Sequence, residues 1–117
     1  MIAVDTDEAA QLWRSWAIGA RHLSRVLISQ GRDFDATLKN ARAATYERAV
    51  AVLRANPDQE QAAKVMMKKA VEAHVRTPPM IGFDEAAIRY TVARTWQRCA
   101  LMLDRSLDEV QPLWLEC

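Results

Sequence analysis

Apolar residues recur along this chain at intervals of three and four residues, which is the period of an amphipathic α-helix. No stretch shows the strict alternation of apolar and polar residues that is typical of a half-buried β-strand. Only three glycines and four prolines interrupt the pattern, which favours a few long elements. We expect four main helices, one from the Asp5–Glu8 cap to about Gly31, and the others over roughly 36–55, 57–76 and 84–103.

Capping residues predict where the later helices begin. Asn56 followed by Pro57 predicts the start of the third helix, with Asn56 as the N-cap. Two successive prolines make 77–83 the one clear loop. Phe83, before a cap at Asp84, is expected to contact Ile88 as a hydrophobic staple.

A further capping box lies near the C-terminal end of the sequence. It spans Ser106 to Glu109 and predicts a short helix that Pro112 limits. The expected fold is therefore all-α: a compact bundle of four main helices plus a short C-terminal helix, with residues 1–117 forming a single domain.

Two helices carry clear apolar stripes. Counting about 100° per residue from Arg14, four residues of the first helix fall at roughly 160–220°: Leu12, Trp16, Leu23 and Leu27. The stripe of the fourth helix consists of Ile88, Val92, Trp96, Cys99 and Leu103. We expect both stripes to face the core, with Trp13 at the boundary of the first.

Arginines lie opposite both stripes, at Arg14, Arg21, Arg25, Arg94, Arg98 and Arg105. Acids instead gather at the predicted helix starts, where the helix macrodipole favours them. The first helix has no acid between Ala9 and Gly31 that could pair with its arginines. Two interpretations stay open: a solvated face neutralised by acids elsewhere in the fold, such as Asp33 or Asp35, or a surface for a polyanion or an acidic partner.

The amino-acid composition indicates a globular domain and argues against a membrane-spanning or secreted protein. Half of the 117 residues are hydrophobic and 26% are charged, as in globular domains, and the net charge is only +1. No run approaches the roughly 18 apolar residues of a membrane span, and the acidic start MIAVDTDEAA is unlike a secretory signal. We expect a cytoplasmic protein.

No catalytic or metal-binding signature is visible in the sequence. His22 and His74 fall on different predicted helices without a second ligand nearby, Cys99 lies in an apolar stripe, and Cys117 is alone. No phosphate-binding loop, nucleophile elbow or dinucleotide-binding motif occurs. We therefore expect no enzymatic activity, no metal, no cofactor and no small-molecule substrate.

Four apolar side chains are candidates for a partner interface: Trp13, Ile18, Ile28 and Trp114. The isoleucines flank the arginine row, where a purely solvated face carries few apolar residues. Core packing is the leading interpretation of Met66 and Met67, and a flexible binding face is the second. One alternative function is thus a protein–protein interaction module: a homo-oligomer, an adaptor or a phage-type inhibitor.

The size, helix content and outward arginines together resemble the small helical, non-catalytic subunit of multi-subunit CRISPR effector complexes. Members of that family contact nucleic-acid strands through basic residues. The resemblance implies an antiviral defence role and contact with the backbone of RNA or single-stranded DNA within a larger complex. It maps strand contact to Arg14, Arg21, Arg25, Arg94 and Arg98. The charges of the second helix are scattered, so backbone contact is expected rather than sequence-specific DNA recognition.

Overall fold

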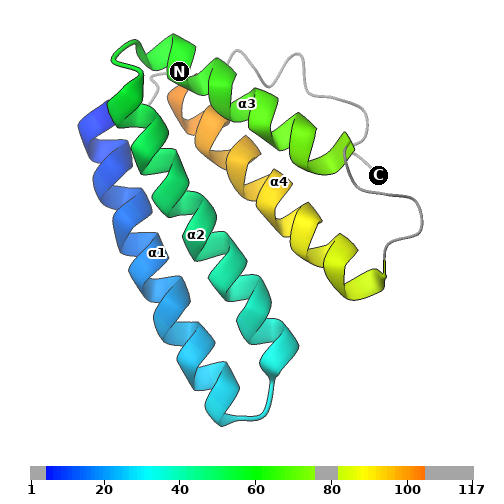
Figure 1. Cartoon of the computed structure of the whole chain (residues 1–117). Helices are drawn as coiled ribbons and strands as arrows, with labels where there is room; N and C mark the ends of the chain where they lie inside the picture. The colour runs from blue at the N-terminus through cyan, green and yellow to red at the C-terminus, as the bar shows by residue number, and fades with distance from the viewer. Residues whose placement is uncertain (1–4, 76–81, 105–117) are drawn as a thin grey trace.

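The computed structural model describes residues 5–75 and 82–104, which form four α-helices (Figure 1). Helix α1 spans Thr6–Ser29, α2 spans Asp33–Ala55, α3 spans Gln59–Val75 and α4 spans Phe83–Leu103. No strand occurs in these two ranges, which confirms the all-α prediction. The predicted short helix from Ser106, together with Arg105, lies outside the described residues.

Helix α2 is the central element of the bundle. It pairs with α1 as an antiparallel hairpin and also packs against α4, while α3 pairs with α4 (Figure 1). Contact between α1 and α4 is slight and includes the Trp13 indole, whose Nε1 donates to the Met102 sulfur at 3.3 Å. Helices α1 and α3 therefore form the two edges of the fold.

Both ends of α1 lie where the sequence predicts. Asp5 is the N-cap, and its Oδ1 accepts the Glu8 amide at 3.0 Å. At the other end, the Arg32 amide donates to the Leu27 carbonyl at 2.9 Å, which is the long bond of a Schellman motif. Gly31 has a φ of +77°, a left-handed conformation that only glycine adopts without strain. This turn brings α2 back alongside α1.

The predicted starts of the three later helices differ from the observed ones, and α2 begins at Asp33 instead of about residue 36. Asn56 ends α2 instead of capping α3, because the Asp58 side chain accepts the Glu60 amide at 2.9 Å and so caps the helix itself. Helix α4 begins at Phe83, with Gly82 as its N-cap. The Phe83 side chain is 82% exposed, so the predicted staple does not form.

The stripe of α4 is confirmed as a core face, but the buried face of α1 differs from the predicted one. Trp16 and Leu23 are 36% and 48% exposed. Helix α1 buries a face about 70° away from the predicted stripe, consisting of Ala9, Trp13, Ala17, Ala20 and Ser24. Its small side chains allow close packing against the buried alanines of α2, so the large leucines do not mark the core side.

Trp13 belongs to the core. Its side chain is completely buried, so the prediction that it lies at the boundary and forms part of a partner interface is wrong. The ring lies beside Met102 of α4, to whose sulfur its Nε1 donates. Met66 of α3 is also completely buried, which agrees with the core interpretation of that helix.

Cys99 is expected to be chemically inert in the folded protein. Burial raises the pKa of its thiol well above the ordinary value of 9.0, although the nearby Arg98 charge acts in the opposite direction. The thiol therefore stays protonated at pH 8. Because only the thiolate form of a cysteine is reactive, Cys99 does not react in the folded protein. In a Cys117→Ser variant, we expect a thiol reagent such as DTNB to label Cys99 only after denaturation. Rapid labelling of the native variant would show that Cys99 is accessible.

Candidate nucleic-acid interface

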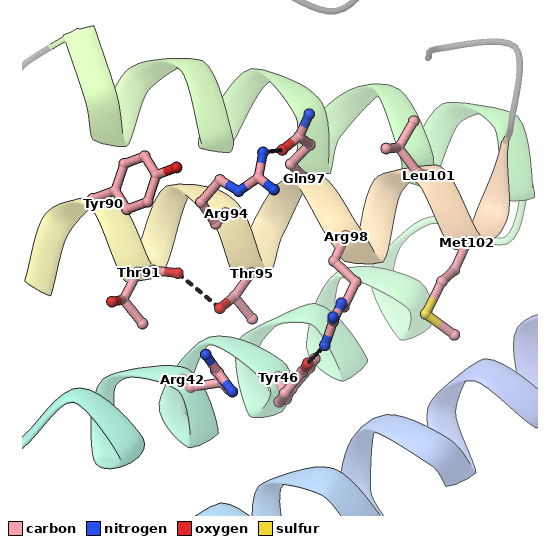
Figure 2. Close-up of a pocket in the computed structure, with 10 residues that line it drawn as sticks. All are labelled: Arg42, Tyr46, Tyr90, Thr91, Arg94, Thr95, Gln97, Arg98, Leu101 and Met102. Atoms are coloured by element: carbon pink, nitrogen blue, oxygen red, sulfur yellow. Dashed lines mark hydrogen bonds between the residues drawn. The ribbon is translucent and has the colours of Figure 1, made fainter. Parts of the chain in front are cut away.

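A groove of about 700 Å³ lies between α2 and α4 (Figure 2). Arg42 and Tyr46 line it from α2, and Arg94 and Arg98 are among the residues that line it from α4. Its other lining residues are tyrosine, threonine, glutamine, leucine and methionine, with no aspartate or glutamate. Three guanidinium groups thus line one concave surface to which residues 5–75 and 82–104 contribute no carboxylate.

Neutral side chains orient two of these arginines. Arg94 Nη1 donates to the Gln97 Oε1 at 2.8 Å, and the Gln97 side chain is buried. Arg98 Nη1 donates to the Tyr46 hydroxyl at 3.4 Å, which links α4 to α2 (Figure 2). Amide and phenol acceptors position a guanidinium without cancelling its charge, and each guanidinium has further N–H donors available.

The two threonine hydroxyls in the α4 wall of the groove form their hydrogen bonds within α4. The hydroxyls of Thr91 and Thr95 donate to the carbonyls of Ala87 and Thr91, at 2.9 and 2.7 Å. These hydroxyls therefore do not occupy the arginines. Tyr90 lies at the rim and is 42% exposed, so its ring is accessible to a ligand.

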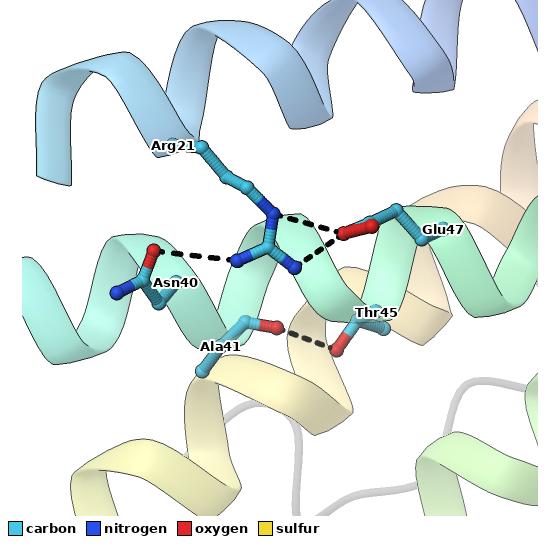
Figure 3. A network of polar contacts seen from close by, with 5 residues as sticks. All are labelled: Arg21, Asn40, Ala41, Thr45 and Glu47. Carbon is cyan, nitrogen blue, oxygen red and sulfur yellow. Dashed lines mark hydrogen bonds and ion pairs between the residues drawn. The ribbon is translucent and has the colours of Figure 1, made fainter.

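Arg21, from the arginine row of α1, is held by α2 (Figure 3). Its Nε donates to the Glu47 Oε1 at 3.1 Å, and its Nη2 forms an ion pair with the same oxygen. Its Nη1 lies 3.5 Å from the Asn40 Oδ1. A carboxylate from another helix thus compensates this charge, as the solvated-face interpretation requires.

The arginine row of α1 and the groove lie on different sides of the hairpin. Arg14 and Arg25 are exposed, next to the compensated Arg21. Trp16 instead faces the groove side, where its ring lies 5.5 Å from that of Tyr46, a groove residue. Trp16 and Arg21 are about 140° apart around the helix. The five predicted nucleic-acid contacts therefore separate into two surfaces, and only Arg94 and Arg98 belong to the groove.

Ion pairing distinguishes the groove arginines from Arg21, which pairs with Glu47, and from Arg32 in the turn after α1. Arg32, the N-cap residue of α2, pairs with Asp35 at 2.7 Å. Arg42, Arg94 and Arg98 form no ion pair with a carboxylate of residues 5–75 or 82–104. The groove therefore carries positive charge that no ion pair among the described residues compensates.

Sequence reasoning did not single out Arg42. The charges of α2 have no common face, and no local spacing places Arg42 beside α4.

Among the predicted partner contacts, Ile18 and Ile28 are 72% and 54% exposed, whereas Trp114 lies outside the described residues.

Comparison of the chain with protein-family models, with curated proteins and with solved structures finds no match. Across the described ranges, no helix has the combination of length and apolar character needed to cross a bilayer. Nor do the histidine, cysteine and acidic residues in these ranges form a group of three or more that could hold a metal ion. A cytoplasmic location stays a prediction.

Proposed function

We propose that this protein binds the phosphate backbone of single-stranded RNA or DNA in the groove between α2 and α4, and that it acts without catalysis. One observation carries the proposal. Arg42, Arg94 and Arg98 line one concave surface from two helices, and none of its described lining residues is a carboxylate. Clustered arginines of this kind are the usual electrostatic footprint of nucleic-acid binding.

The spacing along α4 suits a chain of phosphates. Arg94 and Arg98 are separated by one helical turn, about 6 Å along the axis, so each guanidinium can contact a different phosphate. Arginine is well suited to this role because its planar fork binds phosphate oxygens through two parallel hydrogen bonds. Tyr90 at the rim offers an aromatic face on which an unpaired base can stack.

Binding is proposed rather than catalysis because of the groove's chemistry. Among the described residues, its polar lining consists of guanidinium, phenol, hydroxyl and amide groups, without a histidine, carboxylate or thiol to act as a general base. The proposal includes the role of a small subunit in a larger nucleic-acid complex, as in the CRISPR resemblance. That part is supported only by size, helix content and outward arginines.

Salt dependence tests the proposed function. Labelled single-stranded RNA, single-stranded DNA and duplex DNA are titrated with the protein at several salt concentrations, and binding is followed by fluorescence anisotropy. With three arginines engaged on a single strand, log K is expected to fall with log salt with a slope of about −2. Absent binding, or binding that is insensitive to salt, would refute the proposed function.

A further inference from the structure

An apolar strip runs along one side of α1. Its residues follow one another at intervals of four, three, four and three, and we call them the α1 strip: Leu12, Trp16, Gly19, Leu23 and Val26. This is the a and d spacing with which two helices pack in a coiled coil. Trp16, Leu23 and Val26 are 36%, 48% and 38% exposed, and a Cβ built at Gly19 meets nothing within 4 Å. A continuous exposed apolar surface of this kind is typical of an interaction site.

We propose that the α1 strip packs against the α1 strip of a second copy of this chain, in an antiparallel and two-fold symmetric dimer. The strip is complementary to itself in that orientation. With the two-fold axis at the level of Arg21, Leu23 faces the partner's Gly19, and Trp16 faces the partner's Val26. Each larger side chain then meets a smaller one, as interdigitating packing requires.

The charge distribution on α1 favours a second copy over a charged partner. Arg14, Arg21 and Arg25 lie about 160° around the helix from the centre of the strip, so they point away from the proposed interface. The residues beside the strip on its open side, Ser15 and His22, carry no permanent charge. Two α1 helices can therefore approach without bringing like charges together.

Another hollow, of about 550 Å³, lies beside the strip between α1 and α2. Leu23, Val26 and Leu27 line its α1 side, and its remaining lining residues are Leu38 and the polar or charged residues Gln30, Arg32, Asp35, Lys39 and Arg42. In the antiparallel alignment, the partner's Trp16 lies at the level of Val26, beside this hollow. The proposed interface thus gains an aromatic anchor next to a pocket, which is the usual arrangement of an interface hot spot.

Mass measurement by size-exclusion chromatography with light scattering tests the dimer. The unsubstituted protein is expected at twice the 13.3 kDa of one chain. Leu23→Glu places two carboxylates in the apolar seam by symmetry, so we expect the dissociation constant to rise by about 100-fold or more. Ile18→Glu is the matched control, because Ile18 is 72% exposed on the arginine side of α1, and this variant is expected to remain dimeric.

Gly19→Gln separates a lost interface from a damaged fold. Glutamine favours a helix more than glycine does, and the site is open, so thermal unfolding of the monomer is expected at the same or a higher temperature. The added side chain prevents the close approach of two helices, so dimerisation is expected to weaken about tenfold.

A monomeric unsubstituted protein overturns the proposal, as does a dimer that Ile18→Glu dissociates and Leu23→Glu does not. A monomer destabilised by Leu23→Glu indicates instead that residues 105–117 cover the strip. Because none of these readouts involves nucleic acid, the dimer and the proposed function fail separately.

Discussion

Replacing Trp13 by alanine is expected to lower the free energy of unfolding by about 3–5 kcal/mol, the usual cost of removing a large aromatic side chain from a core. The ring is completely buried and lies where α1 meets α4. Alanine leaves a cavity there and also removes the hydrogen bond to Met102. Domains of this size are typically stable by only about 5–15 kcal/mol, so a large part of the stability is lost. Urea denaturation followed by circular dichroism measures the change.

Trp16→Ala is the matched control for this prediction. The Trp16 ring is 36% exposed and meets the Tyr46 ring edge-on at an interplanar angle of 60°. Its removal opens no closed cavity, so at protein concentrations at which the chain is monomeric we expect a loss of only about 1 kcal/mol. A larger loss for Trp16→Ala than for Trp13→Ala would contradict the assigned buried face of α1 and would restore the leucine stripe as the core side.

Reversing the charges of Arg94 and Arg98 is expected to weaken binding of a single-stranded oligonucleotide by about 100-fold or more at low salt. Each substitution by glutamate removes a phosphate contact and adds a charge that repels the backbone. The slope of log K against log salt is expected to become shallower by about 1.4, since each phosphate contact contributes roughly 0.7 on a single strand. Anisotropy titrations of the double variant across a salt series give both quantities.

Lys64→Glu with Lys68→Glu is the charge-matched control. These exposed lysines lie one turn apart on α3, as the two arginines do on α4, and reversing them changes the net charge equally. We expect a loss of less than about fivefold, because the salt of the buffer screens charges outside the binding surface. Equal losses in both double variants would mean that net charge, not the groove, determines binding. A selective loss in an Arg14→Glu, Arg25→Glu variant would instead place the site on α1.

The sequence predicts the helices of this fold well and its packing less well. Helix boundaries follow from local chemistry, such as the Asp5 cap and the left-handed Gly31, which short stretches of sequence contain. The buried face of α1 depends on which helix approaches it. A hydrophobic pattern gives most weight to Leu23 and Trp16, whereas α2 packs against the alanines beside Trp13. Small residues at a close helix contact give a weak apolar signal, which explains the error of about 70°.

The groove could be predicted only in part, for a similar reason. The arginine side of α4 follows from helical periodicity, and the structure places Arg94 and Arg98 there, exposed. Arg42 and Tyr46 complete the groove from α2, far away in sequence, and only the tertiary packing brings them near Arg98. The ion pair between Arg21 and Glu47 likewise joins two helices, so no local sequence pattern predicts it.

NMR of the arginine side chains tests the central claim most directly. The Nε–H signals of the unsubstituted protein are followed while a single-stranded oligonucleotide is added at low salt. The signals of Arg42, Arg94 and Arg98 are expected to shift together and to saturate at one binding constant, with smaller changes at Arg14 and Arg25. Shifts confined to Arg14 and Arg25, or no shift at any arginine, would contradict the assignment of the groove between α2 and α4 as a nucleic-acid binding site.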